Sequence, residues 1–118
     1  MVSKFDKLRS LVEEWADQKQ ILTKATSVGQ AKKTIEEAQE LLEAAYHLDS
    51  GIPEYMNSKG KLVKSEEEFV DALGDVFVTI IIGSKLRNLD LLSCLESAYN
   101  VISKRTGRIE NGQFKKDE

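Results

Sequence analysis

The chain has 118 residues, 41% of them hydrophobic and 31% charged, which is typical of one soluble globular domain and argues against a disordered chain. Its formal net charge is −3, so no overall basic field attracts nucleic acid. The single cysteine, Cys94, cannot form a disulfide within the chain, and the apolar run at residues 76–83 is too short to cross a bilayer. We therefore expect one cytoplasmic domain over residues 1–118, with no nucleic-acid or membrane partner.

A first amphipathic helix is expected over residues 3–22. Ser3 and Asp6 form a capping-box start, and apolar side chains recur at helical spacing as far as Trp15. Trp15 lies near the end of this apolar stripe. The pattern favours a core position for it, and a platform on which a ligand stacks is the alternative.

A second helix is expected over residues 30–48, with Ser27 as its N-cap. The segment that follows, residues 51–64, contains the only proline, two glycines and several polar residues that favour turns. We expect a loop there.

The third expected helix covers residues 65–86, with Ser65 as its cap, and contains the apolar run VFVTIII. The β-branched residues alone would favour a buried strand, but no partner strand is evident and the preceding EEEFVDALGD is strongly helical. A fourth helix is expected over residues 91–105, with Leu95 and Tyr99 among its inward side chains, and it would end at Gly107.

The tail over residues 106–118 carries an Asn111-Gly112 turn, which is typical of a small hairpin. The sequence therefore predicts an all-α fold of four helices, with one loop and a short irregular tail.

Three carboxylates share one face of the third expected helix. Glu68, Asp71 and Asp75 follow one another at i, i+3 and i+7, which places them within an arc of roughly 60°. Like charges arranged in this way repel one another and are costly to bury unless a cation neutralises them. That cation is either a lysine or arginine of another helix or a metal ion.

A second acidic cluster, IEEAQELLEA, lies on the second expected helix. Glu37 and Glu40 flank its apolar stripe, whereas Glu36 and Glu43 lie further toward solvent. A solvated charged face explains such a cluster when it occurs alone. Two acidic clusters on two helices, with no histidine or cysteine nearby, indicate an oxygen-only site for Mg²⁺ or Mn²⁺ rather than Zn²⁺.

A basic group, formed by Lys104, Arg105 and Arg108, follows the fourth helix, with Asn100 one turn earlier. Interaction with the helix C-terminal dipole explains one or two of these charges. The alternative is a phosphate clamp to which Lys33 of the second helix also contributes.

These motifs resemble those of the MazG-like all-α nucleoside triphosphate pyrophosphohydrolases, in the short single-domain form frequent in bacteriophages. AKKTIEEAQELLEA is similar to the family's K-x-x-E-E-x-x-E-L helix, and EEEFVDALGDVFVTIII is similar to its acidic-to-apolar third helix. AYNVISKRTGRIENGQFKK is similar to the phage-type tail. The resemblance covers most of the chain apart from residues 51–64.

The resemblance implies that Mg²⁺ is held by an ExxE motif and an ExxD motif. Glu37 and Glu40 match the first motif, and Asp75 matches the aspartate of the second. The glutamate of the second motif falls at Ala72, so another acid of the same helix face would supply the missing oxygen. The candidate metal ligands are Glu37, Glu40, Glu68, Asp71 and Asp75.

The resemblance further implies hydrolysis of a nucleoside triphosphate to the monophosphate and pyrophosphate by a homodimer or homotetramer, in a bacterial or phage-infected cytosol. Glu36 or Glu40 would orient the attacking water. The candidate substrate-binding residues are Lys33, Trp15, Asn100, Lys104, Arg105 and Arg108. Two alternatives stay open, a phosphoribosyl-ATP pyrophosphohydrolase and a non-catalytic helical interaction module in which Ala72 marks a decayed site.

Overall fold

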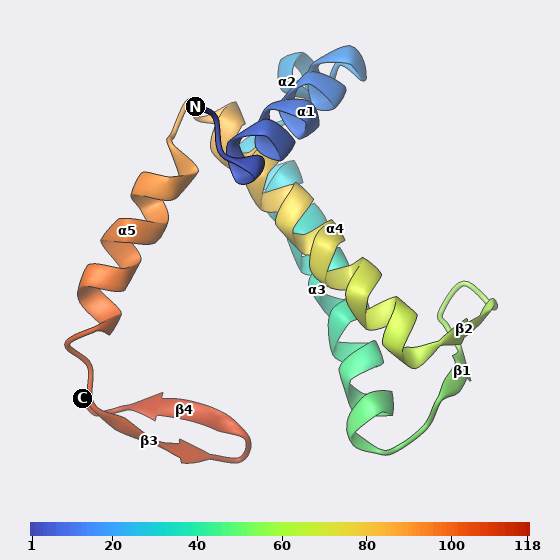
Figure 1. Cartoon of the computed structure of the whole chain (residues 1–118). Helices are drawn as coiled ribbons and strands as arrows, with labels where there is room; N and C mark the ends of the chain where they lie inside the picture. Colours follow the sequence, from blue (N-terminus) through green and yellow to red (C-terminus); the bar gives the residue numbers. More distant parts are fainter. The chain divides into compact units, whose positions relative to one another are not determined.

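A computed structural model describes residues 1–118 as a mostly helical chain with two small antiparallel strand pairs (Figure 1). The mostly α-helical class expected from the sequence is confirmed. The chain divides into two compact units, Met1–Asn88 and Leu89–Glu118. In chain order the elements are α1 (Lys4–Gln18), α2 (Ile21–Lys24), α3 (Ser27–Asp49), β1 (Glu54–Met56), β2 (Leu62–Lys64), α4 (Ser65–Leu86), α5 (Leu91–Ile102), β3 (Gly107–Glu110) and β4 (Gln113–Lys116). None of these helices combines the length and the apolar character needed to cross a membrane.

The first unit is organised around α3 and α4, which lie side by side over much of their length (Figure 1). Small side chains, Ala44 of α3 and Ala72 of α4, are buried where they pack, which lets the two backbones approach closely. Near the other end of the pair, the buried Gln30 side chain donates a hydrogen bond to the Thr79 carbonyl oxygen at 3.2 Å, and Thr34 donates to the Thr79 hydroxyl at 2.9 Å. The VFVTIII run lies within α4 and is helical, as predicted.

The first helix is shorter than predicted. Ser3 caps it as expected, since its hydroxyl oxygen accepts a hydrogen bond from the Asp6 N–H. The helix ends at Gln18 rather than near residue 22, because Gln20 adopts a left-handed conformation with φ of 63°. Residues Ile21–Lys24 form the separate short helix α2. The apolar pattern of the sequence shows no sign of the break between α1 and α2.

Two predicted caps are wrong. Thr26, not Ser27, caps α3, and its hydroxyl oxygen accepts from the Gly29 N–H at 3.0 Å. The helix thus begins three residues before the predicted start at residue 30. Ser65 begins α4 but does not cap it, because its hydroxyl donates to the Ile52 carbonyl oxygen at 2.6 Å. A tertiary contact has taken the place of the local one.

Residues 51–64, expected to form a loop, contain an antiparallel hairpin in which Tyr55 pairs with Val63. Each strand has only three residues, too few to produce a readable alternation of apolar and polar side chains. The hairpin is fixed by burial of Tyr55 and by the stacking of its ring on His47 of α3, with ring centroids 3.8 Å apart.

The second unit contains α5 and the β3–β4 hairpin. The predicted Asn111-Gly112 turn is confirmed, since both residues have positive φ values, 51° and 75°, as a tight two-residue hairpin turn requires. The helix ends at Ile102 instead of residue 105, and Gly107 begins β3 rather than ending the helix. A Cβ at Gly107 would overlap the Lys115 carbonyl oxygen across the hairpin, which excludes larger residues there.

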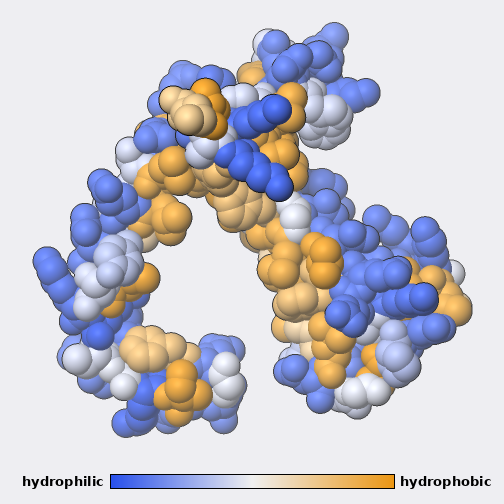
Figure 2. All heavy atoms as spheres, viewed as in Figure 1, coloured by the Kyte–Doolittle hydropathy of each residue, from blue (hydrophilic) through white to orange (hydrophobic).

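The apolar face of α5 is exposed instead of lying inward. Leu95 is 64% exposed and Tyr99 is 61% exposed, and Figure 2 shows hydrophobic side chains on the surface of this helix. The helical spacing is as predicted, but α5 contains no buried residue.

Candidate metal centre

Three carboxylates from two helices meet in the first unit. Glu37 and Glu40 lie one turn apart on α3, and Asp75 comes from the middle of α4. One carboxylate oxygen of each lies within 4.8 Å of the other two. The packing of α3 against α4 creates this carboxylate centre, since residues 37 and 75 are far apart in the sequence.

The surroundings of the centre disfavour its negative charges. Asp75 is an exposed residue, and its pKa is raised first by desolvation and then by the charges of Glu37 and Asp71. The pKa of Glu40 is raised by burial and by its hydrogen bond and charge interaction with Glu37. Because the raised values reflect charge that is poorly neutralised, a cation bound among these oxygens would be stabilised.

The donor set fits a hard divalent cation. All three groups are carboxylates, and neither histidine nor cysteine belongs to the group. Mg²⁺ and Mn²⁺ prefer such oxygen ligands, whereas Zn²⁺ favours nitrogen and sulfur. Only one or two carboxylates are typical of a Mg²⁺ site completed by substrate phosphates and water, so three are enough.

Glu68 and Asp71 lie beside this centre but outside the group of three. They line a cavity of about 170 Å³ together with Asp75. The full lining consists of Glu40, Glu43, Tyr55, Asn57, Ser58, Lys59, Glu68, Asp71 and Asp75. The shared face predicted for Glu68, Asp71 and Asp75 is therefore present, and it opens onto the same cavity as Glu40.

Ala72 is only 2% exposed and lies where α4 packs against α3. A glutamate at this position would place its carboxylate in the helix contact rather than in the cavity. The acids of α4 that line the cavity stand instead at positions 68, 71 and 75.

Two lysines border the carboxylate centre. Lys33 Nζ lies 3.3 Å from Glu36 Oε1 and 3.4 Å from Glu37 Oε1. Lys59 Nζ, from the turn between β1 and β2, lies 3.7 Å from Glu40 Oε1. Lys33 and Glu36 were candidates from the sequence, and the structure pairs Lys33 with both Glu36 and Glu37. Lys59 was missed, and the Asn-Ser-Lys-Gly turn that carries it is the signal that could have identified it.

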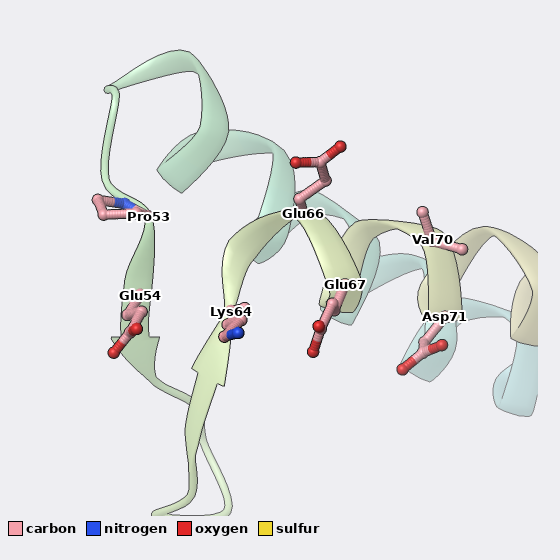
Figure 3. Close-up of a pocket in the computed structure, with 7 residues that line it drawn as sticks. All are labelled: Pro53, Glu54, Lys64, Glu66, Glu67, Val70 and Asp71. Atoms are coloured by element: carbon pink, nitrogen blue, oxygen red, sulfur yellow. The ribbon is translucent and has the colours of Figure 1, made fainter.

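A larger hollow of about 750 Å³ lies on the hairpin side of α4 (Figure 3). In this view the carboxylates of Glu54, Glu67 and Asp71 point the same way, and that of Glu66 points the opposite way. Asp71 lines both this hollow and the smaller cavity of the carboxylate centre. An anionic substrate approaching from this side would meet several carboxylates, which a bound cation would have to offset.

The remaining predicted substrate-binding residues are Trp15 of the first unit and four residues of the second. Trp15 is 47% exposed and lines an apolar hollow of about 370 Å³ between α1 and α4, together with Leu8, Leu11, Val12 and Val78. It is therefore not a core residue, although the core position was favoured. Asn100, Lys104, Arg105 and Arg108 belong to the second unit, where Arg108 pairs with Glu110 at 3.3 Å. The carboxylate centre is built from first-unit residues alone.

No protein-family model, curated protein or solved structure matches this chain. The argument for function therefore depends on the residues and geometry of the carboxylate centre.

Proposed function

We propose that this protein is a Mg²⁺-dependent nucleoside triphosphate pyrophosphohydrolase, which converts a (d)NTP and water to a (d)NMP and pyrophosphate. The observation that carries the proposal is the meeting of Glu37, Glu40 and Asp75, from two helices, within 4.8 Å of one another. The resemblance of both helices to those of MazG-like enzymes supports the same conclusion.

In the proposed reaction, Glu37, Glu40 and Asp75 hold Mg²⁺, and Glu68 and Asp71 provide further oxygens around the same cavity. When bound, Mg²⁺ supplies Lewis-acid chemistry that neutralises the phosphate charges. A carboxylate of the chain orients the attacking water. The proposed residue is either Glu36, which pairs with Lys33, or Glu40.

Lys33 is the first-unit cation that holds a phosphate in this proposal. Its pKa is raised, mainly by the hydrogen bond with Glu36, so it keeps its charge at neutral pH. Trp15 provides an apolar surface for a base.

We also propose that the helices belong to a MazG-like four-helix bundle that works as a homo-oligomer. The exposed apolar face of α5 supports this, because a stripe carrying Leu95 and Tyr99 is costly to leave in water. Light scattering after size-exclusion chromatography should give a dimer or tetramer. A monomer at micromolar concentration would contradict this part of the proposal.

The decisive experiment is a pyrophosphate-release assay with each (d)NTP and with phosphoribosyl-ATP, in Mg²⁺ and in EDTA. We expect release only with Mg²⁺. Asp75→Asn should lower kcat/KM on the order of 100-fold or more, because the carboxylate that holds the cation is lost. Glu66→Gln is the matched control, since it makes the same change on the same helix at a residue that does not line the cavity of the carboxylate centre.

The substrate panel also decides between the alternatives. Release from phosphoribosyl-ATP alone would change the substrate class and keep the site. If no nucleotide is hydrolysed and Mg²⁺ does not raise the Tm, the enzyme proposal is wrong and a non-catalytic interaction module takes its place. Full activity of Asp75→Asn would mean that the site has been wrongly placed.

A further inference from the structure

The β1–β2 hairpin is fastened to both helices of the carboxylate centre. On α3, His47 stacks on Tyr55, and the His47 ring nitrogen Nδ1 lies 2.7 Å from the Glu43 carbonyl oxygen. At α4, the Ser65 N–H donates to the Pro53 carbonyl oxygen at 2.9 Å and its hydroxyl donates to the Ile52 carbonyl oxygen. The base of the hairpin is therefore held on two sides.

The turn of the hairpin is held from within by one side chain. Asn57 Oδ1 accepts hydrogen bonds from the Lys59 N–H at 3.0 Å and from the Lys61 N–H at 2.9 Å. Gly60 takes the positive φ of 77° that the turn requires. The backbone of Lys59 is consequently fixed, while its side chain stays 74% exposed.

This turn extends over the carboxylate centre. Asn57, Ser58 and Lys59 line the same cavity as Glu40 and Asp75. Lys59 Nζ lies 3.7 Å from Glu40 Oε1, on a carboxylate that the proposed function assigns to the metal. An exposed ion pair of this length contributes little to stability, so stability alone does not explain a fixed turn that directs a lysine here.

We infer that Lys59 is a tethered cation that pairs with Glu40 until a divalent metal binds, and that it then releases Glu40 and binds a phosphate of the triphosphate. This inference rests on the proposed function and adds a positioning residue to it. The charges fit, since the metal takes over the neutralisation of Glu40, and the released lysine then meets an incoming polyanion that carries more negative charge than any single carboxylate, such as Glu43, lining the same cavity.

Two binding measurements test the inference without turnover. At low ionic strength, Mn²⁺ binding is measured by calorimetry for the wild type, Lys59→Met, Lys59→Arg and Lys61→Met. We expect Lys59→Met to bind Mn²⁺ about three- to fivefold more tightly, because a surface pair that competes with the metal has been removed. Lys61 is the matched control, since it lies in the same turn and no ion pair joins it to the centre.

The second measurement uses the Mn²⁺–tripolyphosphate complex, which carries the phosphate chemistry without a base or sugar. Binding to Lys59→Met should be roughly tenfold weaker or more, since a charge-assisted hydrogen bond is lost. Lys59→Arg should retain most of the affinity, and Lys61→Met should remain within about twofold of the wild type.

Opposite shifts for the two ligands in Lys59→Met, absent in Lys61→Met, support the inference. Equal shifts in Lys59→Met and Lys61→Met would mean that only the general charge of the turn matters, and would overturn it. The proposed function is tested separately. It is wrong if the wild type binds both ligands but releases no pyrophosphate from any nucleotide. A wild type that does not bind Mn²⁺ overturns both.

Discussion

The two units of this chain differ in how far their apolar residues are buried: the first has a small core, although Leu42 and Val70 of its helices stay exposed, and the second has no buried residue. In the first unit, α3 and α4 bury one another, and Ala72 and Ile81 of α4 are almost completely covered. In the second unit, α5 has a regular apolar stripe, yet Leu95 is 64% exposed. Amphipathic spacing therefore predicts that a helix forms, but not whether a partner within the chain covers its apolar face.

The same contrast separates the two hairpins. The β3–β4 hairpin forms from local signals, with Asn111-Gly112 at its turn and Ile109 paired with Phe114. The β1–β2 hairpin has strands of three residues and depends on contacts with α3 and α4. The contacts of the β1–β2 hairpin place the Lys59 side chain beside the carboxylate centre.

The largest difference between the two units is expected when Ala72→Glu is compared with Ala98→Glu. Ala72 is 2% exposed, so a buried carboxylate without a partner should lower the free energy of unfolding of the first unit by about 3 kcal/mol or more. Ala98 is exposed on α5 of the second unit, and the same change there should alter the free energy of unfolding of the first unit by less than about 0.5 kcal/mol. Denaturation followed by the fluorescence of Trp15, the only tryptophan, reports on the first unit alone.

A different result for Ala72→Glu would be informative. If the variant remains stable and binds Mg²⁺ more tightly than the wild type, position 72 faces the cavity and can restore the ExxD motif of MazG-like enzymes. The burial of Ala72 in the helix contact would then be wrong.

A smaller effect is expected from pH, and only in the first unit. Raised pKa values at Glu40 and Asp75 mean that the folded state binds protons more tightly than the unfolded state does. Their stabilising contribution is fully present below the ordinary carboxyl pKa, near pH 4, and is lost as pH rises through the raised values. In EDTA at pH 7, Glu40→Gln/Asp75→Asn should therefore be more stable than the wild type, by no more than about 1 kcal/mol because solvent screens both groups.

Thermal melts from pH 4 to 8 would show this difference narrowing toward pH 4. With Mg²⁺ present, the wild type should instead gain stability as the pH rises, since protons compete with the metal for the carboxylates. A double variant that is no more stable than the wild type in EDTA at pH 7 would show that repulsion within the carboxylate centre is negligible.

The smallest effect on the first unit is expected from Gly107→Ala. The added Cβ would overlap the Lys115 carbonyl oxygen, so the β3–β4 hairpin should open. Amide hydrogen exchange should lose protection over β3 and β4, while the unfolding of the first unit stays within about 0.5 kcal/mol of the wild type. Gly112→Ala, which strains a turn residue with φ of 75°, provides a second disruption of the same hairpin. Equal destabilisation of the first unit by both variants would contradict the division into two units.

Several elements could be predicted from the sequence because their causes are local. The Ser3 cap, the helical VFVTIII run and the Asn111-Gly112 turn each depend on neighbouring residues. The shared face of Glu68, Asp71 and Asp75 follows from helical geometry alone and is present around one cavity. These features need no knowledge of what packs against them.

Other elements could not be predicted because their causes are distant in the chain. The Ser65 hydroxyl donates to the Ile52 carbonyl oxygen instead of capping its own helix. The short strand that contains Tyr55 is supported by the stacking of the Tyr55 ring on His47. The break at Gln20 is a single left-handed residue that no apolar pattern marks.

The sequence by itself determined that the chain is mostly helical, where most of its helices lie, and that acids gather on two of them. Only the tertiary structure decided which acids meet, namely Glu37, Glu40 and Asp75, and that Lys59 stands beside them. Local spacing fixes the face on which a side chain lies. The packing of α3 against α4, and of the β1–β2 hairpin on both, fixes which faces share one cavity.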